Sequence, residues 1–118
     1  MVMESEIKVL LEQNDFDVDG TMRRFLNNEA LYIKCMKKFL DDQSYQTLKN
    51  AYETGNCQDA FAAAHTMKGF VSNLGINSIY NVLKPMVEKL RAGDMQIGEE
   101  MQILDELYIK VCEIIKGL

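Results

Sequence analysis

Apolar side chains recur three and four positions apart along most of the chain, which is the period of an α-helix. The clearest repeats lie at 79–90 and at 97–115, where the second approaches a heptad. No segment of the sequence alternates apolar and polar residues in the manner of a β-strand. The pattern therefore predicts an all-α protein.

Polar turn and capping residues divide this pattern into elements. The stretch after Glu29 continues past the pair Asp41 and Asp42, either as one long bent helix or as two helices in series. The expected helices run from Glu4 to Gln13, from Val18 to Leu26, from Glu29 to about Tyr52, from Cys57 to Gly75, from about Asn77 to Arg91 and from Ile97 to Ile115.

Three positions define the ends and the shape of the helices in the second half of the chain. Gly75 is suited to the left-handed cap that ends many helices. Asn77 or Ser78 can cap the next helix. Pro85 removes one backbone hydrogen bond and is expected to bend that helix near Asn81 without ending it, because the apolar stripe continues in register.

Short connections favour antiparallel packing of consecutive helices. We expect one domain over residues 1–118, an antiparallel up-and-down four-helix bundle at about 29–118, and a cover of short helices at about 1–28. The apolar seam of the last helix is interpreted as bundle core and not as a coiled-coil dimer, because the run is short. A monomer is therefore expected.

Composition narrows the class of protein. Of the 118 residues, 47% are hydrophobic and 26% are charged, as in globular domains. The net charge of −5 repels nucleic acid and anionic lipid, so neither is expected as a partner. No apolar run approaches the roughly 20 residues of a membrane span, and the first eight residues, MVMESEIK, lack the features of a signal peptide. A cytoplasmic location is expected.

Candidate metal ligands are sparse in this sequence. Asp15, Asp17 and Asp19 followed by Gly20 are similar to the start of a calcium loop, but the twelfth position of such a loop holds Leu26 and not glutamate. We interpret these acids as turn and N-cap residues. The chain has one histidine and no C-x-x-C pair, so we expect neither a metal nor another cofactor.

The cysteines give no sign of a disulfide framework. They are odd in number and show no paired spacing, which indicates reduced, half-buried small hydrophobes. They are Cys35, Cys57 and Cys112.

The helix expected from Cys57 to Gly75 carries the only histidine, His65. A rotation of about 100° per residue gathers its apolar side chains in one sector, made of Ala60, Ala63, Met67, Phe70, Val71 and Leu74. His65 lies opposite this sector and is expected in solvent. The same outward face carries Gln58, Phe61, Ala62, Lys68, Gly69 and Ser72.

Three neighbours of His65 are unusual for an ordinary helix surface. Gly69 costs roughly 1 kcal/mol in a helix interior and leaves the ring uncovered, so that a bulky partner can reach a ring nitrogen. Lys68 places a cation where an anionic group bound to that nitrogen would lie. Phe61 adds an aromatic ring to the polar face, which is typical of a contact with another protein, and Gln58, Ala62 and Ser72 complete the predicted contact surface.

These residues resemble a known signature. His65, Lys68, Gly69, Leu74 and Gly75 are similar to the H-x-x-K-G-x-x-x-x-L-G motif of histidine-containing phosphotransfer (HPt) domains, the intermediate carriers of two-component phosphorelays. The resemblance extends from FDVDGTMRRFLNNEALY before the motif to LRAGD after it. Three positions depart from the family's pattern, Met67 in place of leucine, Phe70 in place of a small residue, and Val87 where some members carry a polar side chain.

The resemblance implies a helical bundle in which His65 accepts a phosphoryl group from an aspartyl phosphate on a response-regulator receiver domain, or donates one to it. The implied partners are receiver domains, hybrid histidine kinases, or both. The sequence lacks a glycine-rich nucleotide loop, so the protein is expected to be a phosphocarrier without kinase activity. Mg²⁺ is expected on the partner receiver domain.

Two other interpretations remain open. The chain could be an HPt-like docking module that binds receiver or kinase domains without carrying phosphate. It could also be a hydrolytic or metal-dependent enzyme that uses His65, although Ser72 is two turns away and no acid lies within a turn on that face.

Overall fold

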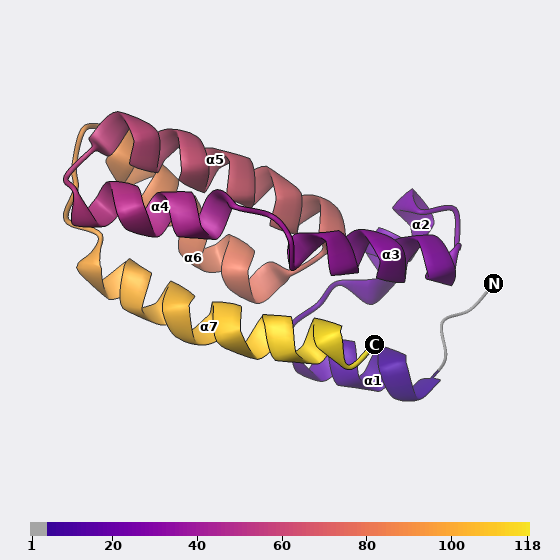
Figure 1. Ribbon diagram of the computed structural model, residues 1–118. Coiled ribbons are helices and arrows are strands. Elements are labelled where there is room, and N and C mark those ends of the chain that lie inside the picture. The colour runs from indigo at the N-terminus through magenta and orange to yellow at the C-terminus, as the bar shows by residue number, and fades with distance from the viewer. Residues whose placement is uncertain (1–4) are drawn as a thin grey trace.

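The computed structural model describes residues 5–118, and these residues fold into α-helices without a β-strand (Figure 1). The all-α prediction is therefore confirmed, while the expected start at Glu4 lies outside the described residues. The helices are α1 (Ser5–Gln13), α2 (Val18–Arg24), α3 (Glu29–Phe39), α4 (Ser44–Glu53), α5 (Cys57–Leu74), α6 (Asn77–Arg91) and α7 (Gly98–Lys116).

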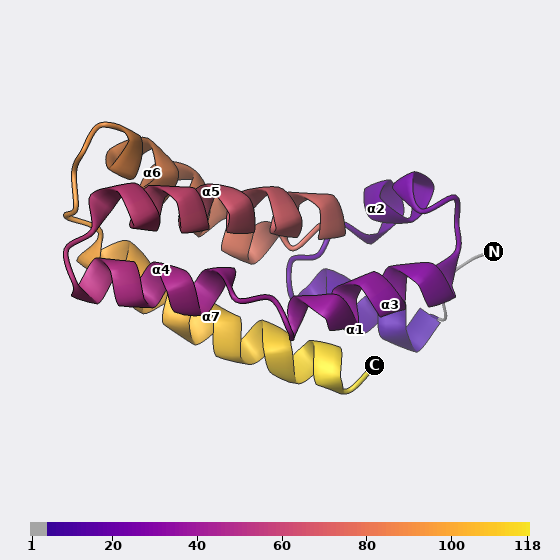
Figure 2. The ribbon, with the colours of Figure 1, turned by 45° about the horizontal axis from the view of Figure 1, so that its top comes forward.

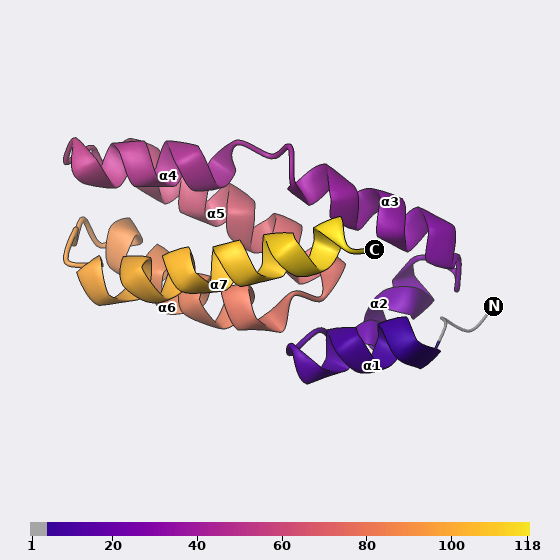
Figure 3. The same ribbon diagram turned by 60° about the horizontal axis from the view of Figure 1, so that its bottom comes forward.

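The segment after Glu29 forms two helices in series, α3 and α4, joined by an elbow at residues 40–43 (Figure 3). The Asp42 carboxylate accepts a hydrogen bond from the backbone N–H of Ser44 at 3.1 Å. Such a local bond gives the backbone an alternative to the helical bond, because a short acidic side chain competes for nearby N–H groups. The elbow lets α3 and α4 follow different stretches of α5.

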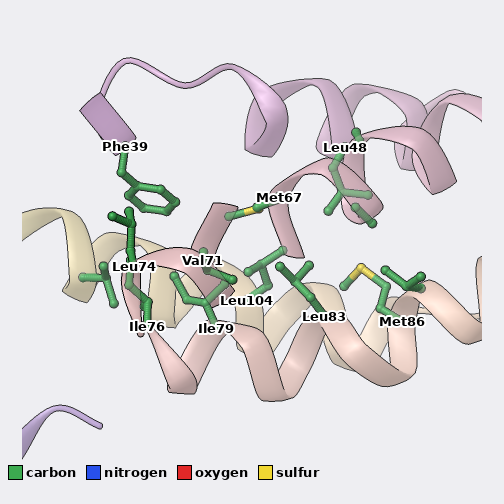
Figure 4. Close-up of a cluster of buried hydrophobic side chains, with 14 of the residues drawn as sticks. Phe39, Leu48, Met67, Val71, Leu74, Ile76, Ile79, Leu83, Met86 and Leu104 are labelled. Carbon is green, nitrogen blue, oxygen red and sulfur yellow. The ribbon is translucent and has the colours of Figure 1, made fainter. Parts of the chain in front are cut away.

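The core lies where α4, α5, α6 and α7 face one another (Figure 4). α5 contacts both α4 and α6, and α6 also contacts α7. The Tyr45 ring of α4 stacks on the Tyr108 ring of α7 with 3.8 Å between centroids, so α7 also meets α4 (Figure 2). Fully buried side chains from the four helices fill the space between them, among them Leu48, Met67, Val71, Leu83, Met86 and Leu104.

α5 and α6 run in opposite directions from the tight turn at residues 75–76. The thiol of Cys57, at the start of α5, donates to the carbonyl oxygen of Leu90, near the end of α6, at 3.4 Å. At the other end of the pair, Lys68 lies over the ring of Tyr80. α6 continues through Pro85, as its unbroken apolar stripe predicts.

The N-terminal segment fixes the end of α5. A bridge between Phe16 and Ile76 joins the two segments, with the N–H of Asp17 donating to the carbonyl oxygen of Gly75 at 2.8 Å. The Arg24 guanidinium donates to the carbonyl oxygens of Ser72 and Asn73 at 3.1 and 3.2 Å. α1 is tied to α2 by an ion pair between Lys8 and Asp19 at 3.0 Å.

Several details differ from the sequence-based expectations. The second helix ends at Arg24, and Leu26 lies beyond it with a left-handed φ of 55° and a side chain that is 88% exposed. Leu31 of α3 is 43% exposed, although the spacing of apolar residues predicts it on the apolar side of that helix. Neither Asn77 nor Ser78 caps α6, because its N-cap is Ile76, which the bridge to Phe16 holds in place.

Two smaller predictions are confirmed. Asp17 caps α2, since its carboxylate accepts the N–H of Gly20 at 3.1 Å. The three cysteines are free and half-buried.

Over the span from residue 5 to residue 118, no helix combines the length and the apolar character that crossing a membrane requires.

Candidate functional site

The ends of α5 are both defined by local chemistry. At the start, the Asn56 side chain accepts the N–H of Asp59 at 3.0 Å, which satisfies one of the free donors of the first turn. At the end, Gly75 adopts a left-handed φ of 72°, and the N–H of Ile76 reaches back to the carbonyl oxygen of Val71 at 2.9 Å. The predicted glycine cap is thus confirmed, and α5 is capped at both ends.

His65 lies in the middle of α5 and is exposed, as its position opposite the apolar sector predicts. The opposite side of the helix is buried and consists of Ala60, Ala63, Ala64, Met67, Val71 and Leu74. Phe70, predicted to be part of this sector, is half-buried and meets the Phe39 ring of α3 edge-on at 5.8 Å. The imidazole is accessible from solvent on a helix whose other face is fixed in the core.

Phe61 is placed differently from the expectation of a free aromatic contact. Its ring is half-buried and stacks on the His65 ring, with 5.7 Å between centroids and 17° between planes. The guanidinium of Arg91, at the end of α6, lies over the Phe61 ring at 5.1 Å from its centroid. Phe61 therefore orients the imidazole and links it to a cation that the sequence interpretation did not connect with the site.

Lys68 is half-buried and leans toward α6. Its ammonium lies 6.0 Å from the centroid of the Tyr80 ring, so the cation rests on the α6 side of His65. Sequence interpretation missed Tyr80 as the neighbour that holds Lys68. Antiparallel pairing of α5 with α6 about the turn at 75–76 brings the second half of α5 near the start of α6, but periodicity alone does not select Tyr80.

Gly69, one turn after His65, faces open space. A Cβ atom built on Gly69 would meet no atom within 4 Å outside the helix itself, so core packing does not require a glycine there. Gln58, Ala62 and Ser72 are exposed, as predicted. No side chain stands over the imidazole at the Gly69 position, which leaves room for another protein.

Two pockets flank the ridge that carries His65. The first, of about 330 Å³, lies between α4 and α5; Ala62 and Thr66 line it together with the carboxylates Asp42 and Asp59. The second, of about 500 Å³, lies between α3 and α5, and we call it the α3–α5 groove. Its lining includes Cys35, Lys38, His65, Thr66, Gly69 and Phe70.

Lys38 is the charged member of the α3–α5 groove, and sequence interpretation missed it. The stretch KCMKKF makes α3 locally basic in a chain of net charge −5, and this was the available signal. Which of its lysines faces His65 depends on how α3 lies against α5, and periodicity does not contain that information. The structure selects Lys38.

Val87, at a position where a polar neighbour of the imidazole would be useful, is fully buried and contributes no polar atom to the surface. Within residues 5–118 no group of three or more His, Cys, Asp or Glu side chains could hold a metal ion.

Comparisons of the chain with models of protein families, with curated proteins and with solved structures found no match. The surface around His65 is therefore the basis for assigning a function.

Proposed function

We propose that this protein is a histidine phosphotransfer protein similar to HPt domains. In this proposal His65 accepts a phosphoryl group from the aspartyl phosphate of a receiver domain and passes it to another receiver in a two-component phosphorelay. One observation carries the proposal: the only imidazole of the chain is exposed in the middle of a helix that is capped at both ends, beside a glycine that core packing does not require.

The transfer asks little of the protein beyond a positioned nucleophile and nearby positive charge. A ring nitrogen of neutral imidazole uses its lone pair to form a P–N bond while the P–O bond to the aspartyl carboxyl group breaks. The aspartate leaves as a carboxylate, and the proton on the second ring nitrogen passes to solvent. Phe61 holds the ring plane, and Lys68 offsets charge on the phosphoryl oxygens.

We also propose that α3 with α4, α5, α6 and α7 are the four members of an antiparallel up-and-down bundle, with α1 and α2 as its cover. The contacts of α5 with α4 and α6, of α6 with α7, and of Tyr45 with Tyr108 support a closed ring of helices. A bundle of this kind supplies rigid placement, so nucleotide and Mg²⁺ chemistry belongs to the partner domains.

A docking module that carries no phosphate is the second candidate. It is favoured by the α3–α5 groove, which offers a partly apolar surface beside His65, and by Lys68, whose ammonium rests over Tyr80. Such a module would bind a receiver or kinase domain through this surface and leave His65 unmodified.

Incubation with a panel of phosphorylated receiver domains tests the carrier proposal. We expect label to reach the protein as an acid-labile, base-stable phosphate. His65→Gln should abolish acceptance without changing helix content by circular dichroism, because the exposed ring supports no core contact. A His65→Gln variant that accepts label normally would contradict the assignment of His65.

Thiol protection separates the carrier from the docking module. Cys35 lines the α3–α5 groove, whereas Cys112 lines a different pocket with Tyr108 and Ile109 of α7. A bound receiver should slow alkylation of Cys35 more than that of Cys112. Protection of Cys35 by several phosphorylated receivers, without any label on the protein, would favour the docking module and contradict the carrier.

A further inference from the structure

The two flanks of His65 differ in charge. The pocket on the α4 side contains the carboxylates of Asp42 and Asp59, whereas the α3–α5 groove contains the ammonium group of Lys38. A phosphoryl group bears about two negative charges near pH 7. Electrostatics therefore favours a phosphoryl group on His65 that is directed toward the α3–α5 groove and away from Asp42 and Asp59.

Lys38 is well suited to reach such a group. It is exposed in the last turn of α3 and lines the groove together with Cys35, three residues before it on the same side of the helix. Among residues 5–118 it forms no ion pair with a carboxylate, in contrast to Lys8, Lys49 and Lys89. Its flexible four-carbon stem lets the ammonium move within the groove.

Lys38 and the imidazole line the same groove on this side of α5. Gly69 contributes no side chain to the groove, and Thr66 also lines it. Lys68 lies apart from both pockets, on the α6 side of the helix over Tyr80. The imidazole thus has one lysine on its α6 side and another on its α3 side, from helices far apart in sequence.

We propose that Lys38 is a second cation that binds the phosphoryl group carried by His65. This inference rests on the proposed function, because it concerns the phosphorylated state. Lys38 and Lys68 would contact phosphoryl oxygens from opposite sides, and Thr66 would donate a hydrogen bond to one of them. Lys68, in the motif around His65, then supplies one of the two positive charges, and Lys38 of α3 supplies the other.

The test uses the whole chain phosphorylated by phosphoramidate, a small donor that needs no partner protein. Phosphorus NMR follows the second ionisation of the phosphoryl group as the pH is changed. A neighbouring cation favours the dianion, so Lys38→Ala should raise the midpoint by about 0.2 to 0.7 pH units, the size of an exposed ion pair. Lys68→Ala should act in the same direction, and Lys38→Arg should restore the midpoint.

Lys37→Ala is the matched control, because Lys37 is also exposed in the last turn of α3 but does not line the groove. In Lys37→Ala, the midpoint of the second phosphoryl ionisation should stay close to that of the protein without a substitution. The shift in Lys38→Ala should also shrink in high salt, since screening weakens exposed ion pairs. The same variant should shorten the phosphohistidine half-life about two- to fivefold.

Equal midpoints for Lys38→Ala and the unmodified sequence would overturn the inference, as would equal shifts for Lys37→Ala and Lys38→Ala. Failure of phosphoramidate to label His65 would overturn it too, because the imidazole would then be inaccessible even to a small phosphoryl donor. If receivers never label the protein while the Lys38 shift is present, the proposed function fails and the charge arrangement stands. If receivers label His65 but Lys38→Ala does not shift the midpoint, the proposed function stands and the inference about Lys38 fails.

Discussion

A single missing side chain at residue 69 leaves the imidazole open to a second protein. Gly69 is one turn from His65, and a Cβ atom there would meet only open space. A glycine inside a helix loses roughly 1 kcal/mol relative to alanine, and no contact within the protein returns this stability. In the proposed function, the benefit of Gly69 is the approach of a partner protein to His65.

Gly69→Leu should raise the free energy of unfolding by about 0.5 to 1 kcal/mol. The same change should slow transfer from a receiver at least tenfold, because the new side chain fills the α3–α5 groove beside His65. Gly69→Ala is the control, with a similar gain in stability and a much smaller loss of transfer. Urea unfolding and transfer kinetics measure the two effects, and normal kinetics in the leucine variant would show that access is not the reason for the glycine.

At the scale of elements, α5 depends on the N-terminal segment for the position of its last turn. The carbonyl oxygens of Ser72, Asn73 and Leu74 accept hydrogen bonds from Arg24 and from the buried hydroxyl of Tyr32. These bonds satisfy acceptors that a helix end leaves free. Arg24 of α2 and Tyr32 of α3 thus hold the last turn of the helix that carries His65.

Gly75→Ala should disturb this junction severely. A Cβ atom at Gly75 would lie 2.7 Å from the carbonyl oxygen of Asp17 and closer still to the Thr21 hydroxyl, on a residue whose φ is already 72°. We expect a loss of about 2 to 4 kcal/mol in the free energy of unfolding. Gly55→Ala is the control, because Gly55 has the same φ with open space around it, and it should lose only about 1 kcal/mol. Equal losses in urea unfolding would contradict the role given to the Gly75 contact.

Sequence periodicity predicted the helices well, because each depends on local spacing and on local caps. It identified His65 as exposed and Gly75 as a cap for the same reason. It failed where tertiary contacts decide the outcome: Ile76 is fixed by Phe16 from the N-terminal segment. Phe61 lies under Arg91, and Lys38 lines the same groove as His65, only because α6 and α3 pack against α5.

At the scale of the whole molecule, tyrosines join segments that are distant in sequence. Tyr32 donates to Leu74 of α5 at 2.9 Å, and Tyr45 of α4 donates to Asp105 of α7 while stacking on Tyr108. Burial raises the pKa of all three phenols above the ordinary value near 10, that of Tyr108 to about 12. Each phenol is therefore held in its neutral form by the fold.

Alkaline pH should consequently weaken the protein. A phenol whose pKa is higher in the folded state than in the unfolded state stabilises the fold fully below about pH 10 and progressively less as the pH rises further. The free energy of unfolding in urea should thus fall between about pH 9 and about pH 11. Tyr108→Phe should make this fall smaller, and a fall that is identical in both proteins would show that Tyr108 does not contribute.

The most direct test of the central claim is to locate the modified atom after transfer from a phosphorylated receiver. Tandem mass spectrometry under alkaline conditions, which preserve phosphohistidine, should find the phosphoryl group on His65 in the protein without a substitution. It should find the group on no residue in His65→Gln. A protein that remains unlabelled with every receiver tried, or that is labelled at another residue, would contradict the account.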